Sequence, residues 1–251
     1  MDLGISGRRA AVAAASAGLG LACARALATE GVRVAFCGRR PDRVDAAVAA
    51  LRADGGDAVG LVVDVSDAEG GGAFVDQATD ALGGVDILVT NAGGPPPGTF
   101  ASTDLAAYPP ALGQNLLSTV AMCKAAVPAM AERGWGRVVA ITSMTVRQPA
   151  PTLILSNTAR AGATAFLKTL ATEVAPQGVT VNSVQPGLHA TDRLAQLYGG
   201  DLSTAAATVP VGRVGHPDDF GAAVAFLCSE QARFITGTAL SIDGGTYLGL
   251  M

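Results

Sequence analysis

Two polar side chains, Ser156 and Arg160, stand four residues apart in a stretch with a helical pattern, so they share one face of that helix. A guanidinium carries a permanent positive charge and a rigid fork of donors, and it does not give up a proton. A serine hydroxyl can hold a water molecule where polar partners surround it. The pair can therefore orient and polarise a substrate oxygen, whereas the proton must come from another group.

A second set of polar and glycine residues follows the ends of apolar runs. The stretch "AAASAGLG" opens onto a helix at Gly18 and Gly20, where free N–H groups and the helix dipole favour a pyrophosphate. The next run ends in "GRR" with no acid, and Arg39 there can hold a 2′-phosphate. Two further runs end at Asp64 and Asn91. In an open parallel sheet, ligands bind beyond the carboxyl ends of the strands, so these ends predict one dinucleotide site.

The elements that carry these residues alternate between strands and helices. The helices are expected at 19–30 and 41–54, with others between the later strands, and the strands are expected at 8–14, 32–37, 58–65, 85–90, 136–142, 178–184 and 239–245. These strands are nearly continuous apolar runs, which is typical of strands covered on both faces. The alternation predicts an α/β protein in which residues 1–251 form a single domain, a Rossmann-type doubly wound parallel sheet of seven strands.

Two stretches interrupt this pattern. Gly70, Gly71 and Gly72 fall in an expected helix, and glycine is unfavourable there, so we expect a loose surface helix. Pro109 and Pro110 fall where a long helix should run, so that helix is expected to restart with a proline in its first turn.

Composition excludes several classes of partner. The chain has a net charge of −4 and no block of Lys or Arg, which argues against a nucleic-acid or membrane partner. The N-terminal "SGRRAAVAAASAGLG" resembles a secretory signal but runs directly into the second strand, so we expect a cytoplasmic protein. No metal site or disulfide is expected, because no two cysteines are spaced as a CxxC pair and each falls in an apolar run: Cys23, Cys37, Cys123 and Cys228.

The order and spacing of several motifs carry a family resemblance. They are "AAASAGLG", "DVS", "TNAGG", "QNLLS", "ITSM", "VQPGLHATD" and "VGRVGHPDDFGAAVAFLCSE…ITGTALSIDGG". Over its entire length the chain resembles a classical short-chain dehydrogenase/reductase of the 3-oxoacyl-carrier-protein-reductase-like kind.

The resemblance implies NADP(H) as the cofactor. It places residues 18–20 at the pyrophosphate, 64–65 at the adenine, 91–93 at the middle of the cofactor, and 186–188 with Thr191 at the nicotinamide. It also implies a homotetramer, or a homodimer, built through two long helices and the C-terminal strand. The expected cofactor-binding residues are Ser16, Gly18, Leu19, Gly20, Arg39, Asp64, Val65, Asn91, Ala92, Gly93, Arg160, Pro186, Gly187, Leu188 and Thr191.

The sequence also departs from the family pattern. Family active sites use Asn, Ser, Tyr and Lys; Asn115 and Ser143 match, but Ser156 stands where the Tyr belongs and Arg160 where the Lys belongs. The combination is similar to a subgroup with an "SN…R" pattern preceded by a "GGPPPG" loop. The cofactor turn, which usually opens with Thr-Gly, here reads Ala-Ala, so Ala14 adds a methyl group where the backbone turns tightly.

The function expected is NADPH-dependent reduction of a carbonyl group, a ketone on a small or polycyclic organic substrate, with a non-standard proton donor. Of the candidate donors, His189 is the most attractive, although an exposed loop position is the more common role for such a residue. Packing is the expected role of Tyr108 and Tyr198, and helix capping that of His216.

Two alternatives remain open at this stage. One is a non-redox enzyme on the same fold, namely a cyclase, isomerase or dehydratase, and the other is a non-catalytic cofactor-binding protein. In each case, residues 95–97 are expected to stiffen one wall of the substrate pocket, and residues 188–209 to form a lid.

Overall fold

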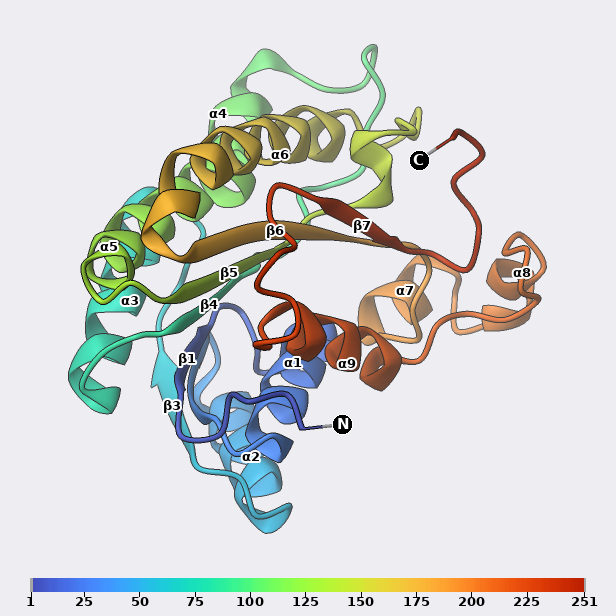
Figure 1. Cartoon of the computed structure of the whole chain (residues 1–251). Helices are drawn as coiled ribbons and strands as arrows, with labels where there is room; N and C mark the ends of the chain where they lie inside the picture. Colours follow the sequence, from blue (N-terminus) through green and yellow to red (C-terminus); the bar gives the residue numbers. More distant parts are fainter. Residues whose placement is uncertain (1, 251) are drawn as a thin grey trace.

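A computed structural model describes residues 2–250, and in them seven parallel strands form one sheet (Figure 1). The strands lie in the order β3-β2-β1-β4-β5-β6-β7. Their bounds are β1 Arg9–Val12, β2 Arg33–Gly38, β3 Ala58–Val62, β4 Ile87–Thr90, β5 Gly136–Ile141, β6 Val179–Pro186 and β7 Ala239–Ile242. The predicted seven-stranded, doubly wound α/β fold is confirmed; residues 1 and 251, the ends of the predicted domain, lie outside the described part.

Helices cover both faces of this sheet. The helices α1, α2 and α9 pack on one face and α3, α5 and α6 on the other (Figure 1). Their bounds, with those of the shorter helices, are α1 Gly18–Thr29, α2 Pro41–Ala53, α3 Ala68–Leu82, α4 Tyr108–Leu112, α5 Ser118–Glu132, α6 Ile154–Val174, α7 Asp192–Leu197, α8 Leu202–Ala206 and α9 Pro217–Leu227. None of the helices within residues 2–250 combines the length and the apolar character needed to cross a membrane.

Alternate residues of a central strand enter different hydrophobic layers. In β1, Ala10 and Val12 pack with the α1 side, whereas Ala11 packs with the α3 side, and all three are fully buried. This two-sided burial explains why the strand is an unbroken apolar run in the sequence. It also fixes where β1 ends, and hence where the glycine turn begins.

The glycine-rich helix α3 is not the loose surface helix that was expected. The carboxylate of Asp67 caps it by accepting a hydrogen bond from the backbone N–H of Gly70 at 2.8 Å. A Cβ atom on Gly71 would lie 2.8 Å from the carbonyl oxygen of Ser118, at the start of α5. The absence of a side chain at Gly71 therefore allows α3 and α5 to approach each other closely, a packing role that helix propensity does not reveal.

The helix that contains Pro109 and Pro110 restarts as expected. Both prolines lie in the first turn of α4. Backbone N–H groups there have no partner within the helix, so proline costs no hydrogen bond. The chain then continues through a π-helical segment, Gly113–Leu117, into α5. This wider turn holds Asn115, which is only 4% exposed.

Candidate active site

The turn after β1 is tight and is held by two neighbouring strands. Ala14 has a φ of 47°, which makes it the one non-glycine residue of positive φ among residues 2–250. Its N–H points to the Sγ atom of Cys37 (3.3 Å), and its carbonyl accepts a hydrogen bond from Nδ2 of Asn91 (3.1 Å). A Cβ on Gly20 would lie 2.7 Å from that carbonyl oxygen, so glycine is required for α1 to begin here.

A cavity of about 210 Å³ lies against this turn, at the carboxyl ends of β1 to β4. Gln114 reaches it from the π-helical segment and was missed from the sequence, although it directly precedes Asn115. The structure thus brings a large part of the predicted cofactor site together. The cavity is lined by the predicted residues Ser16, Arg39, Asp64, Val65, Asn91, Ala92 and Gly93, and by Ala14, Ala17, Gly38, Val63, Ser66 and Gln114.

The charges around this cavity suit a phosphorylated nucleotide. Arg39 is exposed at its edge and forms no ion pair within the described part of the chain. Its neighbour Arg40 is occupied, because it binds Asp42 at 2.5 Å. Asp64 accepts a hydrogen bond from the N–H of Ser66 (3.1 Å), which orders the end of the β3 segment. A guanidinium that has no carboxylate partner among residues 2–250 fits a 2′-phosphate better than a ribose hydroxyl.

The segment after β6 passes over the glycine turn. Gly18 has a φ of 59°, and a Cβ there would lie 3.7 Å from the side-chain methyl of Thr191. Thr191 also caps α7, because its hydroxyl accepts from the N–H of Leu194 (3.3 Å). The N–H of Gly187 donates to the carbonyl of Ile242 in β7 (3.0 Å), which anchors the start of this segment. Thr191 of the predicted nicotinamide segment therefore lies beside Gly18 of the predicted pyrophosphate turn.

The remaining predicted cofactor residues lie in β6, in the segment after β6 and in α1. Pro186 is the last residue of β6. The carbonyl of Leu188 accepts a hydrogen bond from the N–H of Gly215 (2.8 Å). Leu19, in the first turn of α1, is partly buried against the hydrophobic layer below the sheet. Pro186 and Leu188 therefore help to fix the backbone of the segment after β6. Leu19 has a packing role.

Arg160 lies at the centre of the predicted catalytic group. Its Nη1 donates to the carbonyl oxygens of Ile141 (2.9 Å) and Thr142 (3.1 Å), and its Nη2 donates to that of Ala92 (3.4 Å). Burial, and then the positive charge of Arg193, lowers the pKa of Arg160 to about 10. The guanidinium therefore stays protonated at neutral pH, in a setting where its charge acts strongly.

Ser143 and Asn115 flank Arg160. The hydroxyls of Ser143 and Thr145 are 2.9 Å apart, and Ser143 Oγ accepts from the N–H of Thr145 (3.1 Å). Nδ2 of Asn115 donates to the carbonyl of Gly93 (2.9 Å), but its Oδ1 is buried without a partner among residues 2–250. An unsatisfied buried acceptor costs about 1–3 kcal/mol and is typical of a functional site. Thr145 is a further hydroxyl of this site that sequence reasoning did not identify.

Ser156 lies one turn before Arg160 on α6, so the two share a face as predicted. Its hydroxyl makes no hydrogen bond to any residue in the described range 2–250, which leaves it available to a water molecule or a ligand. The next residue, Asn157, is engaged, because its Nδ2 donates to the carbonyl of Ala150 (2.9 Å). That bond ties the start of α6 to the loop before it.

His189 is placed where it cannot readily serve as a proton donor. The side chain is buried, its ring meets that of Phe220 edge-on at 5.2 Å, and Nδ1 lies 3.3 Å from the carbonyl of Gly187. Burial lowers the pKa of His189, against smaller opposing effects of that carbonyl, Asp219 and Asp243. The imidazole is therefore neutral at pH 7 and packs on α9, which argues against both the donor role and an exposed loop position. His216, in contrast, caps α9 as expected, since Nδ1 accepts from the N–H of Asp218 (3.3 Å).

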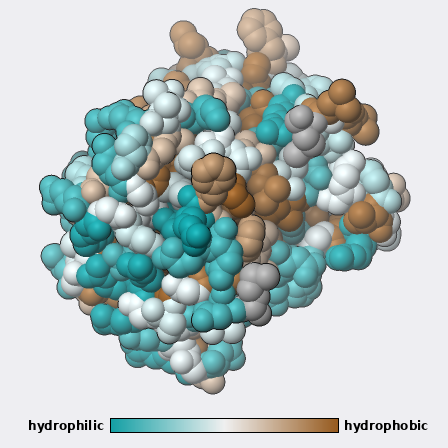
Figure 2. Space-filling view, in the orientation of Figure 1, coloured by the Kyte–Doolittle hydropathy of each residue, from teal (hydrophilic) through white to brown (hydrophobic). Residues whose placement is uncertain are grey.

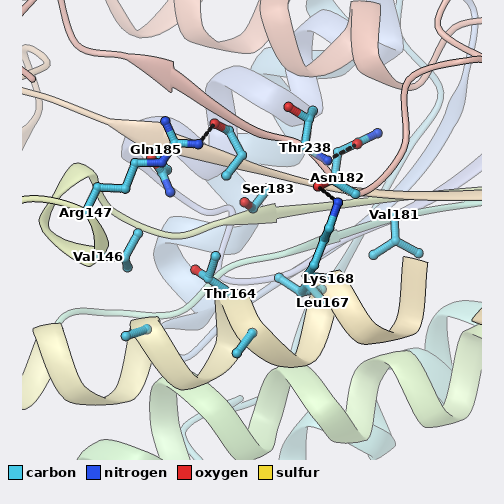
Figure 3. A pocket seen from close by; sticks show the side chains of 14 residues that line it. Val146, Arg147, Thr164, Leu167, Lys168, Val181, Asn182, Ser183, Gln185 and Thr238 are labelled. Carbon is cyan, nitrogen blue, oxygen red and sulfur yellow. Dashed lines mark hydrogen bonds between the residues drawn. The ribbon is translucent and has the colours of Figure 1, made fainter. Parts of the chain in front are cut away.

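A larger cavity lies elsewhere, between α6 and the strands β6 and β7 (Figure 3). Its volume is about 430 Å³, yet none of the predicted site residues lines it. Lys168 reaches across it to the carbonyl of Gly237 (2.9 Å), and Arg147 reaches that of Ala239 (3.1 Å) (Figure 3). The candidate site is therefore chosen by the convergence of strand ends and not by the size of a cavity.

The cysteines contribute no reactive group to the site. All four are buried and free, and burial raises the pKa of the Cys37 thiol to about 12. Among residues 2–250, no three His, Cys, Asp or Glu side chains are grouped so that they could hold a metal ion.

Comparison with known proteins relates this geometry to one family. Residues 13–247 match the family model described as enoyl-(acyl carrier protein) reductase. The chain is 35% identical to human dehydrogenase/reductase SDR family member 4 over 245 residues, which are 96% of this chain and 88% of the relative. L-Sorbose reductase from Gluconobacter frateurii, solved with NADPH and L-sorbose, superposes with a TM-score of 0.93 at 33% identity, with both chains covered in full. A 7α-hydroxysteroid dehydrogenase solved with NADH and a 7-oxo bile acid superposes with a TM-score of 0.92 at 29% identity, covering 100% of this chain and 98% of the other.

Replacement of Ala14 by Gly should stabilise the protein by about 1 kcal/mol, because a left-handed backbone costs an L-residue with a Cβ roughly 1–2 kcal/mol. Ala13→Gly is the matched control: Ala13 does not have a positive φ, so this variant should be less stable than the wild type. Urea denaturation measures both. An Ala14→Gly variant no more stable than the wild type would mean that the turn is not strained.

Replacement of His189 by Asn should leave the pH dependence of kcat/KM unchanged while lowering stability at pH 7 by about 1–2 kcal/mol through lost packing. Because its pKa is lowered by folding, protonation of His189 favours the unfolded state, so wild-type stability should fall as the pH decreases through about 6.5. The variant should lack this contribution, which thermal melts at pH 5, 6 and 7 measure. Loss of one limb of the pH–rate profile would instead identify His189 as the donor.

Proposed function

The chain belongs to the classical short-chain dehydrogenase/reductase family of oxidoreductases, and from this premise we propose that it is an NADPH-dependent reductase of a carbonyl group on a small or polycyclic organic substrate. The observation that carries the proposal is the cavity at the carboxyl ends of β1 to β4, together with the half-buried Arg160, which bonds to Ala92 of its lining and to Thr142 beside the Ser143–Thr145 hydroxyl pair. The family's fold places a dinucleotide and a reacting group at this edge of the sheet.

The residues present fit a phosphorylated dinucleotide. Gly20 gives the close approach of turn and helix that a pyrophosphate needs, and Arg39 offers an unpaired cation for the 2′-phosphate. Among similar solved structures, one holds NADPH and another NADH, so the choice of NADP(H) rests on Arg39 and on the absence of an acid after β2. Bound NADPH supplies the hydride.

The catalytic group is proposed to be atypical, with Ser156 and Arg160 at the positions where family members carry Tyr and Lys. Arg160 keeps the positive charge that polarises the substrate carbonyl and stabilises the alkoxide formed from it. Ser143 Oγ accepts from the N–H of Thr145 and shares a hydrogen bond with its hydroxyl. The Thr145 hydroxyl is proposed to donate in that pair, which leaves the Ser143 O–H for a substrate oxygen. The free hydroxyl of Ser156 is proposed to hold the water that delivers the proton, in place of His189.

A homotetramer in the cytoplasm is the assembly we propose. A groove of about 320 Å³ runs between the long helices α5 and α6 and is lined mainly by apolar side chains, with Phe166 and Val127 among them. Phe234, between α9 and β7, is 99% exposed. Figure 2 shows hydrophobic residues gathered in the middle of the face that carries α9 and β7. Contact between copies at both places would cover this apolar surface.

The central test uses the full chain, a panel of carbonyl compounds and NADPH carrying deuterium at C4. Reduction should consume NADPH. The product should contain one deuterium and one hydrogen more than its substrate. A Ser156→Tyr/Arg160→Lys double variant should gain generic ketone reduction, because it restores a phenol beside an ammonium group. Product of unchanged mass with unchanged NADPH would point to a non-redox enzyme, and coenzyme binding without turnover to a binding protein.

Replacement of Arg39 by Ala should weaken NADP⁺ binding by roughly tenfold to a hundredfold, the usual effect of losing a charge-assisted hydrogen bond. Binding of NAD⁺ should change little. Arg40→Ala is the matched control, since Arg40 is equally exposed but already paired with Asp42. Titration calorimetry measures all four combinations; equal weakening of both coenzymes by Arg39→Ala would contradict the assignment of the 2′-phosphate to Arg39.

A further inference from the structure

The loop that follows β4 carries a guanidinium on each side. Nη2 of Arg160 on α6 donates to the carbonyl of Ala92 (3.4 Å), and Nη2 of Arg193 on α7 donates to that of Pro95 (3.4 Å). Arg193 also lies directly against Gly94, where a Cβ would come within 2.8 Å of Nη2. Two cations from helices far apart in the sequence therefore converge on four consecutive residues.

The two charges have no counterion among residues 2–250. Within residues 2–250, neither Arg160 nor Arg193 forms an ion pair, and each of their recorded hydrogen bonds goes to a neutral backbone carbonyl. The two guanidinium groups also interact electrostatically. Burial is the larger cause that lowers the pKa of Arg160, and the positive charge of Arg193 is the second. Arg160 is half-buried and Arg193 is exposed. An anion between two like charges would relieve their repulsion and be bound favourably.

Arg193 points to the substrate side of the site rather than to the coenzyme side. Thr191, two residues earlier, turns its methyl group toward Gly18 and the glycine turn, whereas Arg193 reaches Gly94 and Pro95. The loop from Pro95 onward is the predicted wall of the substrate pocket, so the pyrophosphate position and the Arg193 guanidinium lie on different sides of this segment.

We propose that the substrate carries an oxyanion group, a carboxylate or a phosphate, which binds between Arg160 and Arg193. This inference rests on the proposed function and adds the substrate class to it. The planar fork of a guanidinium matches both anions, and each arginine has N–H donors beyond those used on the loop. Because Arg193 lies in the 188–209 segment, the substrate's own charge also fixes that segment against the loop after β4.

The test compares charged and neutral probes by binding rather than by turnover. The full chain, saturated with NADP⁺, is titrated with acetoacetate, with its methyl ester and with inorganic phosphate, followed by calorimetry and by NMR up to millimolar concentrations. Acetoacetate should bind about tenfold or more tightly than the ester, because charge-assisted bonds are lost in the ester. Tighter binding of phosphate than of acetoacetate would identify a phosphorylated substrate, and the reverse order a carboxylic acid.

Arg193→Gln should abolish the preference for acid over ester while leaving the dissociation constant of NADP⁺ within about twofold of the wild-type value. Arg213→Gln is the matched control, because Arg213 lies beyond the same segment, exposed, and is 3.7 Å from Asp219. This variant should keep the preference. The pKa of Arg160 further predicts that acetoacetate binding is unchanged from pH 7 to 9 and weakens above about 10.

Three results would overturn the inference. They are equal binding of acid and ester, no detectable binding of either anion, and an Arg193→Gln variant that loses NADP⁺ affinity while it keeps the preference. Failure of the proposed function is distinguishable, because it appears as no NADP⁺ binding or no reduction, whereas the preference for the anion can still be measured on the coenzyme-free chain.

Discussion

One half-buried arginine joins the carboxyl ends of two adjacent strands. Arg160 binds the carbonyls of Ile141 and Thr142 after β5 and that of Ala92 after β4. The positive charge and these carbonyl oxygens stabilise each other. The loop after β4, the hydroxyl of Ser143 and the start of α6 are all placed relative to this one group.

The coenzyme side depends on a similar connection. Both backbone groups of Ala14 are held from neighbouring strands, its N–H by the Cys37 sulfur of β2 and its carbonyl by the Asn91 amide after β4. The turn can therefore keep a left-handed residue that has a methyl group. Since Gly20 approaches the same carbonyl, the sheet, the turn and the first helix are joined at the edge where we propose that the dinucleotide binds.

Sequence reasoning located the strands, and it brought the predicted coenzyme residues to one edge, because parallel strand ends meet there whatever packs around them. Seven predicted coenzyme residues line a single cavity. Sequence reasoning did not predict the burial of His189 against Phe220 or the contact of Arg193 with Gly94. It also missed the close approach of α3 and α5 at Gly71. Each of these depends on elements distant in the sequence, and neither periodicity nor propensity carries that information.

The π-helical segment at Gly113–Leu117 gives Asn115 its direction. A π turn contains one residue more than an α turn, so it is in effect an insertion that the helix has absorbed without unfolding. Removing a single residue anywhere in this segment would let the backbone relax to a regular α-helix. The amide would then rotate by about 100° away from Gly93. The length of this short stretch is thus under tighter constraint than its composition. Among members of the family, a change of length here would distinguish those that keep the Asn115 amide in place from those that do not.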